Sequence, residues 1–103
     1  MINNLLVINQ LFEIQSKIKE AGNGAPFERN FNRLFAHFQE EGYVIQDPTG
    51  EAYTETRTDC EASITGKPSD KMKITKTLKP VVYQKNETGI QLVQKAVVIA
   101  GNQ

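Results

Sequence analysis

The strongest periodic signal in this sequence is a stripe of large apolar side chains between residues 26 and 41. Its members follow the i, i+4, i+7, i+8, i+11 spacing of one helix face, at Phe27, Phe31, Leu34, Phe35 and Phe38. Pro26 suits the first helical turn, because the N–H that proline lacks is not needed there. Gly42 can form the left-handed cap at the other end. We therefore expect a helix over residues 26–41.

A second helix is expected over residues 2–21. Its main apolar stripe recurs at helical spacing, at Val7, Leu11, Ile14 and Ile18. The stripe is widened to about half of the circumference, at ~100° per residue, by Leu5, Ile8 and Phe12. A face this wide needs more cover than one partner helix supplies. The short connection at residues 22–25 makes the two helices an antiparallel hairpin.

After Gly42 the apolar period changes from helical to strand-like. Short strands are expected at residues 43–46, at the alternating Cys60, Ala62 and Ile64, at residues 72–78, and at residues 92–100. The turns between them are predicted at residues 47–50, 66–70 and 86–89. Two helices followed by a compact antiparallel sheet indicate an α+β fold.

This order divides the chain into a helical hairpin at residues 1–42 and a β-head at residues 43–103. We expect the hairpin to be half of a dimeric four-helix bundle, because its apolar face is too wide for one partner. The alternative is that the sheet of the same chain covers that face. The predicted dimer interface consists of Val7, Leu11, Ile14, Ile18, Phe27, Phe31, Leu34 and Phe38.

Composition argues against several classes of partner. The 12 Lys and Arg residues balance the 12 Asp and Glu residues, so the chain lacks the basic footprint of a nucleic-acid or anionic-membrane binder. No apolar run approaches the ~18 residues of a membrane span. A single cysteine excludes an internal disulfide and favours the reducing cytoplasm. Five lysines between residues 67 and 79 either protect a strand edge or form a docking surface for an acidic partner.

Residues for catalysis are scarce. Cys60 and His37 are the one thiol and the one imidazole, and Cys60 alternates with apolar residues as a buried side chain does. A small hydrolase using Cys60 is the enzymatic alternative. The scattered carboxylates lack the spacing of a metal site, and no Gly-rich loop separates a strand from a helix. We therefore expect a binding protein without a cofactor or metal, not an enzyme.

Residues 41–62 carry a distinctive series of short motifs. A glycine-ended helix, a turn, an aromatic residue and a strand follow one another as Glu41-Gly42-Tyr43, Asp47-Pro48-Thr49-Gly50-Glu51, Tyr53 and Cys60-Glu61-Ala62. This order resembles the β-rich head of GrpE-type nucleotide exchange factors, in which the strand reads His-Glu-Ala. The resemblance covers nearly the whole chain, because it continues in Met1–Glu20, Ile74–Lys79, Val82-Tyr83 and Gln94–Val98.

The sequence departs from the family pattern at several positions. The family's histidine, glycine and proline are replaced by Cys60, Val82 and Lys95. Its partner-facing arginines are replaced by Gln91 and Gln94, and two extra residues lie between Tyr53 and Cys60. The family's long helical stalk has no counterpart in this sequence, so the chain is expected to be either a fragment or a stalkless relative.

The resemblance implies a homodimeric co-chaperone whose head binds the ATPase domain of a DnaK-type chaperone. By preferring the open form of that domain, the head would promote ADP release without covalent chemistry. The partner-binding residues carried by this interpretation are Glu51, Tyr53, Arg57, Tyr83, Lys85, Asn86, Gln91 and Gln94. The alternative is a dimeric interaction module of GrpE-like fold with a non-chaperone partner, which the missing arginines favour.

Overall fold

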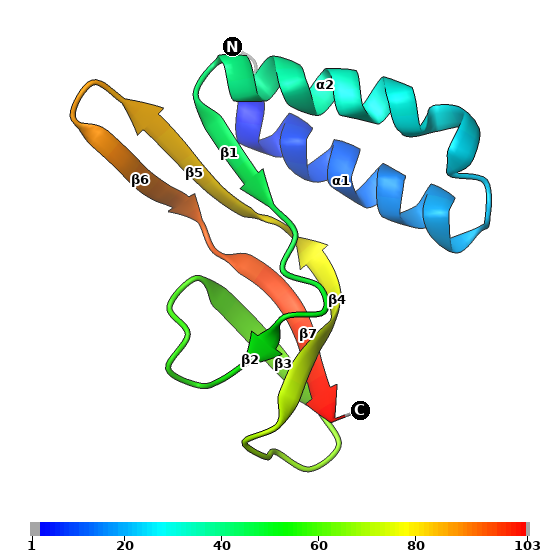
Figure 1. Cartoon of the computed structure of the whole chain (residues 1–103), viewed down its shortest axis with the longest axis vertical. Helices are drawn as coiled ribbons and strands as arrows, with labels where there is room; N and C mark the ends of the chain where they lie inside the picture. The colour runs from blue at the N-terminus through cyan, green and yellow to red at the C-terminus, as the bar shows by residue number, and fades with distance from the viewer. Residues whose placement is uncertain (1–2, 103) are drawn as a thin grey trace.

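Two helices are followed by seven strands within residues 3–102, the part of the chain that the computed structural model describes (Figure 1). The helices are α1 (Asn4–Glu20) and α2 (Glu28–Glu40), with a short 3-10 turn at Ala25–Phe27 between them. The strands are β1 (Tyr43–Gln46), β2 (Ala52–Tyr53), β3 (Cys60–Thr65), β4 (Met72–Lys79), β5 (Val81–Asn86), β6 (Gly89–Gln94) and β7 (Ala96–Asn102). Residues 1 and 2, where the resembling segment Met1–Glu20 and the first predicted helix begin, lie outside the described residues.

Local chemistry fixes where the helices begin and end. The side-chain oxygen of Asn3 accepts a hydrogen bond from the backbone N–H of Leu6 at 3.2 Å, which caps α1. After α2, Gly42 has a φ of +97°, and a Cβ atom there would lie 3.0 Å from the carbonyl oxygen of Lys85. Glycine is therefore required at this position both for the backbone conformation and for the close approach of β5.

The strands form two sheets. Sheet A has the order β1-β5-β6 and is antiparallel throughout. Sheet B has the order β2-β4-β7-β3, in which β3 runs parallel to β7 and the other pairs are antiparallel. One residue, Pro80, separates β4 from β5, and one residue, Lys95, separates β6 from β7. The chain therefore crosses between the sheets twice at one junction (Figure 1).

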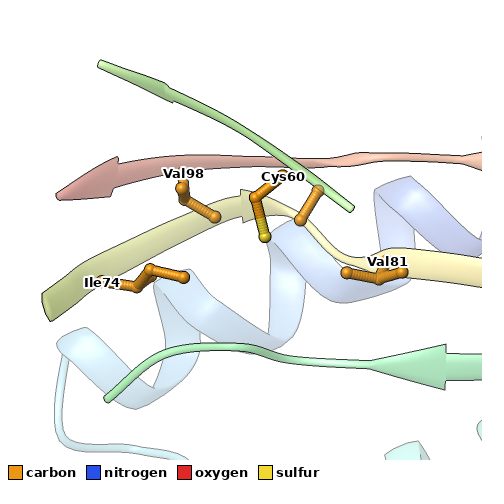
Figure 2. Close-up of a cluster of buried hydrophobic side chains, with 5 residues drawn as sticks. Cys60, Ile74, Val81 and Val98 are labelled. Carbon is orange, nitrogen blue, oxygen red and sulfur yellow. The ribbon is translucent and has the colours of Figure 1, made fainter. Parts of the chain in front are cut away.

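Each sheet has its own cluster of buried side chains. The helices cover sheet A, where Ile8 and Phe38 pack on Val82. Sheet B buries a second cluster made of Cys60, Ile74, Val81, Ala96 and Val98 (Figure 2). Val81 and Val82 are adjacent in β5 and point to opposite sides of the strand, so this short segment joins the two clusters.

The chain is α+β overall, but the predicted arrangement of its elements was wrong. We expected half of a dimeric four-helix bundle and one antiparallel sheet, whereas the strands form two sheets and β3 is parallel to β7. Ile8 and Phe38 pack on the sheet, so part of the wide apolar face is covered within the chain. The strand pattern could not show the direction of β3, because alternation has the same period in both kinds of sheet.

Candidate partner-binding surface

The loop between β2 and β3 is held by the guanidinium group of Arg57. Its Nε donates to Oδ1 of Asp59 at 2.7 Å and its Nη2 donates to Oδ2 at 3.1 Å. Nη2 also donates to Oε1 of Glu51 at 2.8 Å, and Nη1 donates to the backbone oxygen of Ala52 at 3.0 Å. These bonds lower the pKa of the Asp59 carboxyl and raise the pKa of Arg57. A planar, forked cation therefore fixes the shape of this loop.

Cys60 lies directly after this loop and points into the cluster of sheet B, beside Ile74, Val81 and Val98 (Figure 2). Its exposed fraction is 6%. Burial raises the pKa of its thiol to about 11. A nucleophilic cysteine needs an accessible thiolate, and this environment disfavours both accessibility and ionisation.

His37, the other residue considered for catalysis, is exposed on α2. Its Nε2 lies 3.4 Å from Oε1 of Glu41, one turn further along the chain. Within residues 3–102, no group of three or more His, Cys, Asp or Glu side chains is placed to hold a metal ion. None of the helices in that range is both long and apolar enough to cross a membrane.

The predicted partner-binding residues fall into two groups. Glu51 directly precedes β2, Tyr53 ends that strand, and Arg57 lies in the loop that follows it. Tyr83, Lys85, Asn86 and Gln91 lie on the β5–β6 hairpin, which extends away from the body of the molecule (Figure 1). Asn86 shapes the tip of the hairpin, since its Oδ1 accepts from the backbone N–H and the hydroxyl of Thr88.

Gln94 has a different environment from the rest of its group. It is half-buried, and its side-chain amide bonds to Asn9 of α1 and to the backbone oxygen of Pro80. These bonds use the donors and the acceptor that a partner would need. We therefore interpret Gln94 as a residue of the junction between the two sheets.

Sequence reasoning missed the apolar part of the hairpin. Tyr83 pairs with Leu92 and with Val44, and Lys85 pairs with Ile90, so these five side chains share one face. We call them the hairpin face. Ile90 is 58% exposed, and Leu92 is exposed as well. Their alternation and the six successive uncharged residues of Gly89–Gln94 were visible in the sequence, but the predicted strand began only at Leu92 and Gly89 was placed in a turn.

The hairpin face ends at a free strand edge. β6 is the outermost strand of sheet A, so its outer edge is unpaired within the described residues. Natural proteins commonly protect such edges with lysine, proline or a covering segment. β6 contains neither charge nor proline. An exposed apolar strand without that protection is typical of a surface that another protein covers.

The predicted dimer-interface residues are divided by the structure. Phe31 and Phe38 are buried within the chain, and Val7, Leu11 and Ile18 are half-buried. Ile14 of α1, Phe27 of the 3-10 turn and Leu34 of α2 remain exposed. We call these three residues the helical patch.

Comparison of the chain with protein-family models, with curated proteins and with solved structures finds no match.

Proposed function

We propose that this chain is a GrpE-like nucleotide exchange factor that binds the ATPase domain of a DnaK-type chaperone and promotes release of ADP. It would act in the cytoplasm as a binding protein, without a cofactor, a metal or a nucleic-acid partner. The residue-level support for the family is the motif series at residues 41–62. The support for binding through the head is the hairpin face described above.

The exposed hairpin face carries the proposal. It combines an apolar surface at Ile90 and Leu92 with an aromatic ring at Tyr83 and a cation at Lys85. Large apolar and aromatic side chains supply most of the energy of protein interfaces, while charged neighbours contribute to orientation. All four residues belong to the β5–β6 hairpin, which projects from the body of the molecule (Figure 1). This placement suits insertion between two lobes of a partner.

The exchange mechanism requires only differential binding. If the head binds the open form of the ATPase domain more tightly than the closed form, it shifts that domain toward the open state. By linkage, the head then weakens ADP binding by the same factor by which ADP weakens binding of the head. The residues of this chain need only to bind the ATPase domain in its open form, and they transfer no chemical group.

A second candidate is an interaction module with a non-chaperone partner. The observation that favours it is the chemistry at Gln91 and Gln94, where the family has arginines. Gln94 bonds within its own subunit, so it does not replace the contact that an arginine would make. The two candidates share the hairpin face and differ only in the partner.

We also propose that the chain forms a homodimer through the helical patch. Ile14, Phe27 and Leu34 are each more than 40% exposed, whereas Ile8, Phe12, Phe31 and Phe38 of the two helices are buried. Leaving three large apolar side chains in water is unfavourable by about 25 cal/mol per Å² of apolar area. A second copy would cover them by a self-complementary contact.

The experiment measures release of a fluorescent ADP analogue from a DnaK-type protein of the same organism. The wild-type chain should accelerate release, and Ile90→Lys should weaken the effect about tenfold, as the loss of a central apolar contact does. Leu6→Lys is the matched control, because Leu6 is 59% exposed on α1 and is not one of the hairpin-face residues. Absence of acceleration by wild type would reject the exchange function. Equal effects of the two substitutions would reject the hairpin face as the docking surface.

A further inference from the structure

A groove of about 390 Å³ opens between the end of β2 and the turn that joins β3 to β4. Tyr53 and Met72 line it and are directly paired across β2 and β4, so their side chains lie next to each other on one face. Tyr53 is half-buried, with its ring packed partly on the cluster of sheet B. The groove therefore has an aromatic and apolar floor.

The rim of this groove carries negative charge. Glu55 lines it from the β2–β3 loop and Asp70 lines it from the β3–β4 turn. Both are exposed, and within residues 3–102 neither forms an ion pair. Lys67 and Lys71 lie in the same turn but do not line the groove. An occupant would thus meet an aromatic ring and two carboxylates that have no cation of their own.

Both walls of the groove are held in place. The β2–β3 loop is fixed by the side-chain bonds of Arg57 to Asp59, Glu51 and Ala52. The backbone N–H of Arg57 also donates to the backbone oxygen of Thr54. The β3–β4 turn is tied to the last strand, because Asn102 donates to the backbone oxygen of Lys67 at 2.8 Å and bonds to the hydroxyl of Ser69. A preformed groove loses less conformational entropy on binding than a mobile one.

We propose that this groove binds an arginine side chain of a protein partner. A guanidinium group stacks on an aromatic ring and donates in-plane hydrogen bonds to carboxylates, so one side chain can use both the floor and the rim. Anionic side chains are repelled by Glu55 and Asp70, and neutral ones leave the rim uncompensated. As a contact within a complex, the groove rests on the proposed function. The preference of the groove for a cation is independent of the proposed function.

The experiment titrates the full-length chain with N-acetylarginine amide and follows the Tyr53 ring and the backbone amides of residues 53–55 and 68–72 by NMR. N-acetylcitrulline amide, which has the same shape without the charge, is the matched ligand control. We expect saturable shifts confined to these residues with the arginine compound, and binding at least about fivefold weaker with the citrulline compound, the size of a surface charge contact.

The double variant Glu55→Gln, Asp70→Asn should bind the arginine compound about fivefold more weakly than the wild-type chain does. Glu40→Gln with Glu87→Gln is its matched control, because it removes two exposed charges from other elements and should bind as wild type does. Equal binding of the two ligands, shifts centred elsewhere, or an unaffected double variant would each overturn the inference. Because no chaperone is present, these results are independent of whether the chain promotes ADP release.

Discussion

Asn9 of α1 and Gln94 of β6 exchange two hydrogen bonds through their side-chain amides. The Nδ2 of Asn9 donates to Oε1 of Gln94, and the Nε2 of Gln94 donates to Oδ1 of Asn9, each at 2.8 Å. The same Nε2 donates to the backbone oxygen of Pro80 at 2.9 Å. This half-buried pair connects the helices to the point at which the chain crosses between the sheets.

We expect Gln94→Ala to lower the free energy of unfolding by about 1–2 kcal/mol, because it leaves the amide of Asn9 and the carbonyl of Pro80 without their partner. Asn9→Ala should lower the free energy of unfolding by a similar amount. The loss in the double variant should be about 1 kcal/mol smaller than the sum of the two single losses. Urea unfolding of the four proteins measures this coupling. Gln91→Ala, on the exposed part of the same strand, should change stability by no more than about 0.5 kcal/mol. Additive effects at residues 9 and 94 would show that the pair is not coupled.

Gln94 also shows how far the sequence could predict this fold. Helical and strand periods are local, so the stripes at Phe31 and Phe38 and the alternation after Cys60 indicated the elements correctly. The partner of Gln94 lies 85 positions away in the sequence, and no local pattern reports such a pairing. Gln94 was predicted to face a partner because it stands where the GrpE family has a partner-facing arginine, and a polar residue in a strand is usually exposed.

The same limit applies to sheet pairing and to the candidate surface. Val81 and Val82 read as one apolar pair, but they belong to different clusters because they point to opposite sides of β5, directly after the chain changes sheets at Pro80. Ile90 and Leu92 alternate as core residues do, and only the strand order, with β6 at an edge, places them on the surface. Burial of alternating residues depends on which element packs on that face of the strand. The alternation itself does not show this.

The Arg57–Asp59 pair predicts a pH dependence of stability. The pKa of Asp59 is lowered in the folded chain, chiefly because its carboxylate accepts hydrogen bonds from Arg57. Such a group stabilises the fold above its unfolded pKa of 3.8, and this contribution is lost as the pH falls through its lower folded pKa. Thermal unfolding between pH 2 and pH 6 should therefore show a loss of stability below about pH 4. The loss should be smaller in Asp59→Asn.

Arg57→Lys tests the forked geometry directly. Lysine keeps the charge but cannot bond to both oxygens of Asp59 and to Glu51 in one plane, so we expect a loss of about 1–2 kcal/mol at pH 7. Lys85→Arg is the control, because Lys85 is exposed and forms no ion pair within the described residues. A stable Arg57→Lys with an unchanged low-pH profile would contradict the role assigned to this loop.

The thiol of Cys60 should be unreactive in the folded chain. With a pKa of about 11 in place of the ordinary 9.0, it carries about a hundredfold less thiolate at pH 8 than an unperturbed thiol, and it is buried as well. Ellman's reagent should react only after denaturation. The raised pKa also means that Cys60 contributes stability below pH 9, which is lost as the pH rises through about 11. Rapid reaction of the native protein would revive the hydrolase hypothesis.

A matched pair of substitutions tests self-association through the helical patch. Leu34→Glu places a charge in the helical patch, where burial in a dimer would cost several kcal/mol, so it should yield a monomer in sedimentation experiments. Leu6→Glu is also on an exposed helical position but lies outside the patch, and it should leave the association unchanged. Because Leu34 is 43% exposed in the single chain, neither substitution should unfold the monomer. A wild-type protein that stays monomeric at high concentration would refute the dimer, whereas one that associates despite Leu34→Glu would place the contact elsewhere.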